Sequence, residues 1–286
     1  MLGYRQIDYK EDIPDAVNLI KKGLDASYTE TFFRWKHLEN PFGKSYGLLA
    51  TDNEKIIGLR MFMYWRFYNA KENRFLTALR PVDTVVDENY RGRGLFKKLT
   101  LNGLKQCSET YDLVFNTPNE NSLPGYLKMG WEQVETKGFK IGFIRPCLSR
   151  ENLTFNTPEE NIFLNKVGGW ETFKDQVYIA WRYKDDNYKS ANYKDASLIY
   201  RISKLNGFSQ LVLQEAKGKK KELKKLLSNV ATKENAFLVY YYSNIFLDEL
   251  ISIKLSRKKP AVVVKDDISK IADNFSFSLG DLEGKL

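Results

Sequence analysis

The sequence predicts an α/β (or α+β) protein in which helices flank a mixed sheet, and three observations support this fold class. In the first half, apolar runs with strand spacing alternate with amphipathic segments of helical spacing. The β-branched run 82–86 leads through a turn with two glycines directly into a helical segment. The second half repeats part of this order, which predicts two copies of one fold in tandem.

The elements of the first half follow from apolar periodicity and from breaker residues. A strand at Tyr4–Asp8 precedes a helix at Ile13–Leu24, whose apolar residues share one face. A second helix, at about 29–38, ends at Asn40–Pro41, because the residue before a proline disfavours helical backbone. The remaining predicted elements are strands at 46–51, 55–64 and 75–86, a helix at 94–108, a strand at 113–116, a helix at 122–129 and a last long strand region at 131–144.

A short internal similarity links the two halves. The segment Phe32–His37, Phe-Phe-Arg-Trp-Lys-His, has a counterpart in Tyr178–Tyr183, Tyr-Ile-Ala-Trp-Arg-Tyr. Further on, a strand at 210–214, a helix at 219–228, a strand at 237–242 and a helix at 244–250 repeat the order seen from 82–86 to 122–129. Repetition of this kind predicts two similar units side by side, with the second beginning near Pro146 to Asn156. We expect units at residues 1–147 and 148–286.

The charge balance leaves several anionic partners open. The chain of 286 residues carries 45 Lys and Arg against 36 Asp and Glu, a net charge of +9. Nucleic acid, a membrane surface and a polyphosphate cofactor all fit that charge. The densest basic run, Lys217–Lys225, has apolar residues at helical spacing and no interleaved aromatics, which favours a solvated helix face over a nucleic-acid site.

Several classes of site and location are disfavoured by simple counts. Two cysteines, Cys107 and Cys147, and one histidine, His37, provide neither a disulfide framework nor a cluster of metal ligands. The first residues lack the apolar core of a signal peptide, and no apolar stretch approaches membrane-spanning length. We therefore expect a cytoplasmic protein without a metal site or a membrane partner.

The turn Tyr90-Arg91-Gly92-Arg93-Gly94 carries the strongest chemical signal. Glycines adopt turn conformations closed to other residues and let backbone N–H groups approach a ligand closely. The helix that begins here adds unpaired N–H donors and a partial positive charge, which suits a phosphate. Arg91 and Arg93 add full positive charges at the same place. The turn is therefore a candidate pyrophosphate site.

Three other interpretations of this turn compete. A Walker A loop ends in Gly-Lys-Ser/Thr, whereas this chain has Gly94-Leu95-Phe96. A Rossmann fingerprint needs a third glycine where Lys97 stands, although Asp112 lies near the expected ribose-binding position. The turn also fits an ordinary strand-to-helix connection with solvated arginines. From the turn alone, these readings stay open.

Two ordered blocks together resemble the GNAT superfamily of acetyl-CoA-dependent N-acetyltransferases. The first is Arg91-Gly92-Arg93-Gly94, which matches the family's cofactor signature after a strand, with Phe96 in place of the usual small residue. The second is Phe115–Ser122, leading into Tyr126–Trp131, which is similar to the family's next strand and helix. The resemblance covers roughly residues 1–145 and is only topological in the second half.

The resemblance implies an acetyl-CoA site between the strand that ends at Val86 and its neighbour. Backbone groups around Thr84–Val86 would pair with the pantetheine arm, and one N–H would polarise the thioester carbonyl. Asn119 would reach the pantetheine or stabilise the crevice, unless it is only a turn residue beside Pro118. The cofactor-binding residues implied are Val85, Val86, Arg91, Gly92, Arg93, Gly94, Leu95, Phe96, Asn119 and Ser122.

Tyr126 is the candidate general acid by its position in the second block. A phenol, which titrates near ~10, stays protonated at neutral pH and can protonate the leaving thiolate of CoA. A packing role for Tyr126 is the alternative. For the base, Asp83 and Glu30 are candidates by residue type, His37 fits a packing or capping role better, and a water relay is also open.

The expected function is transfer of an acetyl group from acetyl-CoA to a primary amine of a small metabolite or amino sugar. The second unit has Lys217-Gly218-Lys219 where the first has its glycine turn, so we expect it to bind no CoA and to wall the acceptor cleft. Alternatives are transfer to a protein or peptide amine, aminoacyl transfer from tRNA, and a CoA-binding module without catalysis. The oligomeric state stays open.

Overall fold

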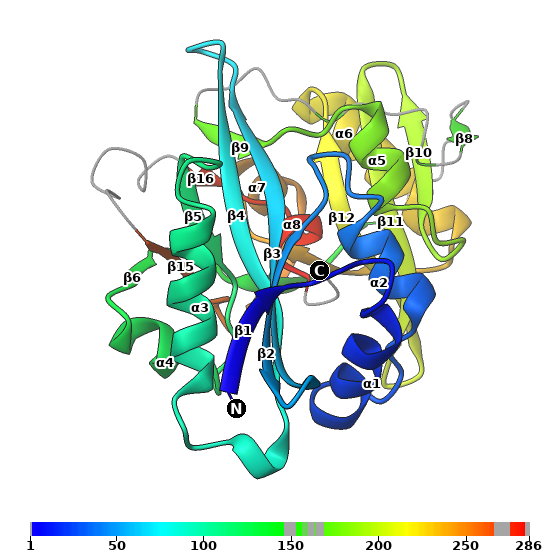
Figure 1. The fold of residues 1–286 in the computed structure, drawn as a ribbon. Helices are drawn as coiled ribbons and strands as arrows, with labels where there is room; N and C mark the ends of the chain where they lie inside the picture. The colour runs from blue at the N-terminus through cyan, green and yellow to red at the C-terminus, as the bar shows by residue number, and fades with distance from the viewer. Residues whose placement is uncertain are drawn as a thin grey trace.

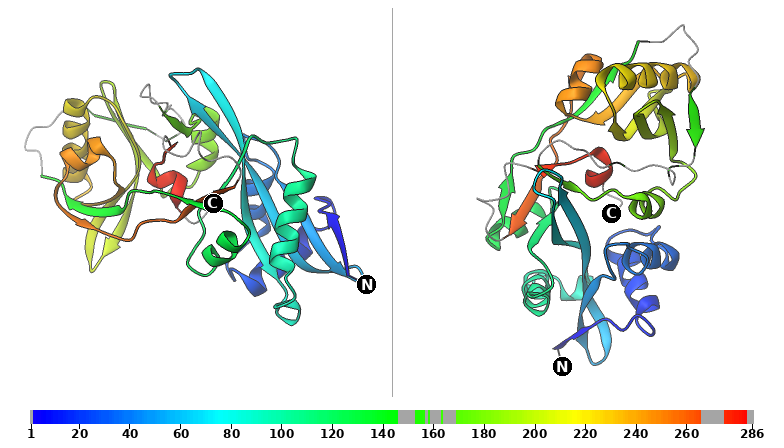
Figure 2. Two further views of the ribbon diagram at one scale, coloured as in Figure 1. Left: turned by 90° about the vertical axis from the view of Figure 1, so that its left-hand side faces the viewer. Right: turned by 90° about the horizontal axis from the view of Figure 1, so that it is seen from above.

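The protein consists of two mixed sheets with helices on their faces, which confirms the predicted fold class (Figure 1). The computed structural model describes residues 2–145, 153–156, 158, 163, 169–265 and 275–283. Cys147 and most of the region near 146–156, where the second half was expected to begin, lie outside the described residues. Figure 2 shows the two sheets side by side, with the short helix α8 (Leu279–Leu282) between them.

The first sheet has nine strands and contains most of the predicted elements of the first half. Its main path runs β1-β2-β3-β4-β5-β15-β6, and β9 and β16 join at the side of β3. The strands are β1 (Leu2–Gln6), β2 (Tyr46–Asp52), β3 (Lys55–Asn69), β4 (Arg74–Val86), β5 (Leu113–Asn116), β6 (Glu132–Val134), β9 (Trp170–Thr172), β15 (Val262–Lys265) and β16 (Phe275–Ser276).

Two pairs of helices cover the two faces of this sheet (Figure 1). Helices α1 (Ile13–Gly23) and α2 (Glu30–His37) lie on one face, and α3 (Leu95–Gln106) and α4 (Leu123–Lys128) lie on the other. A short 3-10 turn, η1 (Glu88–Tyr90), connects β4 to the glycine turn before α3. The bounds agree closely with the predicted segments because apolar periodicity and proline positions specified them.

The second sheet has seven strands in the order β14-β7-β13-β12-β11-β10-β8. Helix α6 (Lys220–Lys233) packs on β10 and β11, α7 (Ile245–Leu250) follows β13, and α5 (Gln176–Arg182) precedes β10. The strands are β7 (Phe139–Phe143), β8 (Thr154–Asn156), β10 (Lys189–Tyr193), β11 (Ala196–Leu205), β12 (Phe208–Lys217), β13 (Leu238–Tyr242) and β14 (Ser252–Ser256).

The two halves of the chain contribute strands to each other's sheets: β7 of the first half joins the second sheet, and β9, β15 and β16 of the second half join the first. Strand β7 lies between β13 and β14, and β15 lies between β5 and β6. The prediction of one long strand region at 131–144 was therefore wrong: it contains β6 in the first sheet and β7 in the second. Strand β6 is Glu-Gln-Val and β7 is Phe-Lys-Ile-Gly-Phe, and neither composition nor spacing identifies the sheet that a strand joins. The division into units 1–147 and 148–286 stays a proposal, in which the units exchange these strands.

The two tryptophans of the repeated segment contact each other where the halves meet. Trp35 of α2 and Trp181 of α5 stack with ring centroids 5.1 Å apart. Each indole Nε1 donates a hydrogen bond to the backbone carbonyl of the other tryptophan, at 2.8 and 2.9 Å. This reciprocal pair relates α2 and α5 as equivalent elements and ties the two halves together inside the apolar core.

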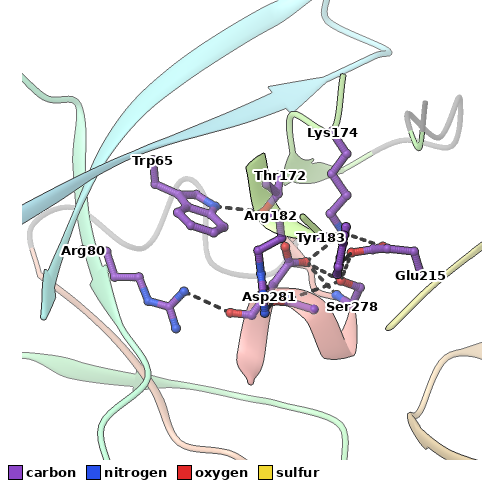
Figure 3. A network of polar contacts seen from close by, with 10 residues as sticks. Trp65, Arg80, Thr172, Lys174, Arg182, Tyr183, Glu215, Ser278 and Asp281 are labelled. Atoms are coloured by element: carbon purple, nitrogen blue, oxygen red, sulfur yellow. Dashed lines mark hydrogen bonds and ion pairs between the residues drawn. The ribbon is translucent and has the colours of Figure 1, made fainter. Parts of the chain in front are cut away.

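A polar network fastens α8 between the two halves (Figure 3). Lys174 Nζ contacts Glu215, Ser278 and Asp281 at 2.9, 2.8 and 3.0 Å. Arg80 of β4 and Arg182 of α5 donate to the backbone carbonyls of Asp281 and Gly280. Ser278 and Asp281 form a capping box at the start of the helix. The helix is therefore held by side chains from both sheets.

Replacing Trp35 by alanine should lower the free energy of unfolding by about 3–5 kcal/mol, because it removes a buried ring and leaves Trp181 without its partner. Chemical denaturation of the variant measures the loss. Val177→Ala on α5 is a matched control, since Val177 is 63% exposed, and should change stability little. A Trp35 variant as stable as its control would show that this contact does not hold the halves together.

Candidate active site

Strands β4 and β5 diverge in the middle of the first sheet. They are parallel and pair only at Ala78 with Leu113 and at Leu79 with Val114. Beyond those pairs, β4 continues to Val86 and β5 to Asn116 without facing each other in register. The backbone groups of β4 that face β5 over 80–86 therefore have no strand partner, and an extended ligand can pair with them.

An irregularity in β4 lies at the point where the strands separate. The register with β3 shifts between Leu59 and Met61, opposite Val85 and Val82. Asp83, between them, has a φ of 46°, which is unusual for a residue other than glycine. Extra residues of this kind bend a strand and increase its local twist. The bulge therefore accounts for the turning of β4 away from β5.

The glycine turn lies at the far end of β4 and opens onto free space. Gly92 and Gly94 have φ values of 76° and 73°, and a Cβ built at either would meet no atom within 4 Å. Gly94 is the N-cap of α3, so the first N–H groups of that helix have no partner within it. Arg91 and Arg93 are exposed beside them, where they bond the carbonyls of Val86 and Asn89.

The predicted cofactor residues form two groups on either side of the diverging strands. One group is continuous along the chain from the end of β4 into α3 and contains Val85, Val86, Arg91, Gly92, Arg93, Gly94, Leu95 and Phe96. The other is Asn119 and Ser122, before α4. Asn119 Oδ1 accepts hydrogen bonds from the Ser122 backbone N–H and hydroxyl at 2.9 and 3.0 Å. Its oxygen thus shapes this loop.

Tyr126 lies beside the end of β5 and is 2% exposed. Its hydroxyl oxygen accepts hydrogen bonds from Arg60 of β3 and Asn116 of β5. Its ring packs edge-on against Phe96, with centroids 5.8 Å apart. Sequence reasoning missed Arg60 and Asn116 as partners. The available signal for Arg60 was a single arginine within the otherwise apolar run 56–65.

The carboxylate of Asp83 is surrounded by donors from α2 and the segment before it. Lys36 Nζ lies 2.8 Å from Oδ1, His37 Nε2 lies 2.9 Å from Oδ2, and the Tyr28 hydroxyl donates to Oδ2. Burial opposes ionisation, but the charge of Lys36 and the bond to His37 outweigh it and hold the Asp83 pKa well below its usual range. Such a carboxylate is ionised and is a weak proton acceptor.

His37 and Glu30, the other candidate bases, lie in different environments. His37 is fully buried, and its Nδ1 lies 3.0 Å from the Ser45 hydroxyl. Burial lowers the pKa of His37 despite the neighbouring Asp83 carboxylate, so the imidazole is neutral at pH 7. Glu30 is exposed at the first position of α2.

A cavity of about 570 Å³ lies where strands of both halves meet. Its walls are residues 133–137 at the end of β6 and beyond it, residues 242–244 at the end of β13, and Phe275–Phe277. Val134 pairs with Val262, the neighbour of Val263, which pairs with Asn116. The cavity thus lies two strands away from Asn116, whose side chain donates a hydrogen bond to the Tyr126 hydroxyl.

The described residues provide no cluster of three or more His, Cys, Asp or Glu side chains suited to a metal ion. Among the helices in the described part of the chain, none is long and apolar enough to cross a membrane. Asp112, considered above as a ribose ligand, accepts a hydrogen bond from the Thr77 backbone N–H at 2.8 Å. It therefore fastens β4 to the start of β5.

The chain is similar in fold to several solved structures, two of which are named GCN5-related N-acetyltransferases. The structure of a GCN5-related N-acetyltransferase from Anabaena variabilis ATCC 29413 matches with a TM-score of 0.71 and 12% identity, covering 93% of this chain and 72% of that one. A GCN5-related N-acetyltransferase from Kribbella flavida matches at 0.66 and 13%, covering 92% and 72%. Eis1 from Mycobacterium abscessus matches at 0.65 and 10%, covering 92% and 73%.

These structural likenesses extend through both halves of the chain and, at such low identities, concern the fold. No curated protein matches the sequence. The family model for an acetyltransferase (GNAT) domain matches residues 4–134, the part that holds the diverging strands, the glycine turn and Tyr126. The chain therefore has the GNAT fold, and its residues 4–134 match the acetyltransferase (GNAT) domain.

Proposed function

We propose that the protein is an N-acetyltransferase that transfers the acetyl group of acetyl-CoA to a primary amine. The observation that supports this most strongly is the divergence of β4 from β5 next to an open glycine turn at the start of α3. The divergence provides unpaired backbone groups for an extended amide-containing arm, and the turn provides N–H donors and two arginines for a pyrophosphate. Few other cofactors combine these two parts.

In this proposal, the pyrophosphate contacts the turn from Arg91 to Phe96, and the pantetheine arm lies along Val85 and Val86. An N–H of β4 near the bulge polarises the thioester carbonyl, which favours attack on its carbon. Asn119 and Ser122 shape the opposite wall through their mutual hydrogen bonds. Arg91 and Arg93 are exposed at the turn, so both side chains can reach a phosphate.

The neutral amine nitrogen forms a bond to the thioester carbon, the carbon–sulfur bond breaks, and its electron pair passes to sulfur. The nitrogen then loses one further proton, which restores Tyr126 through water after the sulfur is protonated. Tyr126 is the proposed acid that protonates that sulfur. Arg60 and Asn116 occupy the acceptor positions of its hydroxyl oxygen, so the phenolic hydrogen is directed elsewhere and remains available for donation.

In this proposal Asp83 does not act as the general base. Both its oxygens are occupied by donors, and its pKa is far below that of an ammonium ion. We propose that Asp83 fixes the bulge of β4 through its contacts with Tyr28 and α2. The ammonium proton then leaves through water, which is the relay considered above.

The acceptor is proposed to be a small amine. The cavity of about 570 Å³ is bounded by both halves and has a mixed polar and apolar lining, which suits a metabolite or an amino sugar. In this arrangement, the second half completes the acceptor side, as expected for a unit without a glycine turn of its own. A panel of amines tested by release of free CoA thiol would identify the class.

Replacing Gly94 by valine should abolish binding of acetyl-CoA, because the side chain fills the space through which a phosphate approaches the backbone. Isothermal titration measures the affinity. Gly207→Val is the matched control: Gly207 also has positive φ, 85°, with nothing near its Cβ, but lies in the β11–β12 turn. It carries the same strain and should bind normally. Equal loss of binding in both variants would contradict the cofactor assignment.

Replacing Tyr126 by phenylalanine should lower kcat by about 100-fold, since a positioned general acid contributes on that scale. The KM for acetyl-CoA should change little because the ring is retained. Steady-state thiol release gives both constants. Tyr46→Phe removes another hydroxyl near the same core and should leave kcat unchanged. Unchanged turnover in the Tyr126 variant would assign the residue to packing.

The buried, neutral His37 predicts that stability falls as pH decreases from about 7 to 5. In the unfolded protein the histidine takes up a proton near pH ~6.5, whereas burial lowers its pKa in the folded protein. The unfolded state therefore binds more protons as pH falls, and the free energy of unfolding decreases with a limiting slope of about 1.4 kcal/mol per pH unit. His37 is the only histidine, so His37→Gln should flatten the dependence. Denaturation at several pH values measures it, and a steeper slope in the variant would refute the assignment.

A further inference from the structure

Arg60 is a buried arginine on the cofactor side of the first sheet. It is 1% exposed, and its guanidinium donates to the Thr84 hydroxyl of β4 and to the Tyr126 hydroxyl of α4. The guanidinium carbon also lies 5.2 Å from the ring centroid of Phe96 and 5.4 Å from that of Tyr126. Arg60 thus joins β4, the first turn of α3 and α4 at the point where β4 and β5 diverge.

The charge of Arg60 is not matched by an acid. Among the described residues, no carboxylate forms an ion pair with it, and its Nε–H has no hydrogen-bond partner. Two buried lysines are matched, since Lys36 pairs with Asp83 and Lys174 pairs with Glu215. Arg80, by contrast, also lacks an ion pair among the described residues, and its Nε–H has no hydrogen-bond partner. Removing a cation from water without a compensating anion is unfavourable, so this arrangement calls for a separate explanation.

Arg80, a buried arginine on the neighbouring strand, does not share this position. It points toward α8 on the other side of the sheet, where it donates to the Asp281 carbonyl and the Thr117 hydroxyl at 3.0 and 2.6 Å (Figure 3). Only the guanidinium of Arg60, of these two, contacts Tyr126 by a hydrogen bond.

We propose that Arg60 is a positioning residue whose charge, acting through the Tyr126 hydroxyl, stabilises the negative charge on the sulfur of CoA as the thioester bond breaks. The inference rests on the proposed function, in which Tyr126 protonates that sulfur. A proton donor lies within hydrogen-bond reach of its acceptor, and Arg60 lies within hydrogen-bond reach of the same phenol oxygen. The charge of Arg60 then acts on the sulfur through this phenol, from one hydrogen bond further away.

The unmatched charge fits this role because the thioester is neutral and the departing sulfur is not. As the amine nitrogen bonds to the carbonyl carbon, the electron pair of the carbon–sulfur bond moves to sulfur, which becomes a thiolate until Tyr126 protonates it. A fixed positive charge therefore interacts more favourably with the transition state than with the bound thioester. An arginine already paired with a carboxylate would lack this difference.

The alternative is that Arg60 has only a structural role. Three aromatic rings, of Phe62, Phe96 and Tyr126, and two hydroxyls surround the guanidinium and stabilise a cation through ring and hydrogen-bond contacts. If Arg60 had only this structural role, the presence of a sulfur atom in the ligand would not change how ligand affinity depends on Arg60. The deciding measurement is therefore the effect of the sulfur on ligand affinity.

The experiment compares the binding of CoA with that of desulfo-CoA, which lacks the sulfur, by isothermal titration between pH 6.5 and 9. Free thiols titrate near ~8.5, and a site that favours the thiolate binds CoA more tightly as pH rises toward that value. We expect the affinity for CoA, relative to desulfo-CoA, to increase about tenfold over this range, which corresponds to a shift of one pKa unit in the bound thiol.

Arg60→Met should remove this relative increase, and Arg60→Lys, which retains the charge without the fork, should keep part of it. Arg66→Met is the matched control, because Arg66 lies on the same strand, also beside aromatic rings, and is exposed. It should behave like the unaltered protein. Desulfo-CoA binding by the Arg60 variants reports that their cofactor site is folded.

The outcomes separate this inference from the function on which it rests. If neither compound binds the unaltered protein, the acetyl-CoA assignment fails and the role of Arg60 fails with it. If both bind with affinities that respond equally to pH, the protein binds CoA and Arg60 does not act on the sulfur. A thiol-dependent increase that persists in both Arg60 variants would also overturn the proposal.

Discussion

The candidate site depends on the buried carboxylate of Asp83, which holds β4 in an irregular conformation. A left-handed backbone at a residue other than glycine is unfavourable and persists only where surrounding contacts determine it. Here the contacts come from Tyr28, Lys36 and His37, which lie on and just before α2. The bulge in turn separates β4 from β5 and exposes the backbone to which a cofactor can bind. Helix α2, on one face of the first sheet, thus shapes the candidate cofactor site, which lies toward α3 on the other face.

The second half shows the same plan with a different outcome. Strands β12 and β13 pair only over Gln210–Val212 with Leu238–Tyr240, and the register of β12 with β11 shifts beside Glu215. Glu215 is then bonded by Lys174 and Tyr183, much as Asp83 is bonded by residues of α2. Here, however, α8 packs against these groups and completes their hydrogen bonds. The region around Glu215 is therefore filled by α8 of the same chain.

The sequence was sufficient for the elements of the first half and for the glycine turn, because these depend on local patterns. Periodicity located α1 and β5, and glycine with a following apolar helix located the turn before α3. The exchange of β7 and β15 could not be predicted, since it depends on which sheet edge each strand meets in space. The partners of Asp83 were also hidden, because Lys36 and Tyr28 lie about 50 residues away in the sequence and pair with it only after folding.

Arg60 shows why a site residue can be visible in a sequence without being understood. A lone arginine in an apolar strand conflicts with burial, and such local conflicts tend to occur at functional positions. The sequence could not distinguish a surface arginine from a buried one, nor reveal that no acid lies opposite. In the folded protein, the carboxylates of Asp83 and Glu215 are each paired with a buried lysine, Lys36 and Lys174. Arg60 and Arg80 are both buried without an ion pair among the described residues, and what distinguishes Arg60 is its place beside the Tyr126 hydroxyl, where the proposed chemistry needs a positive charge.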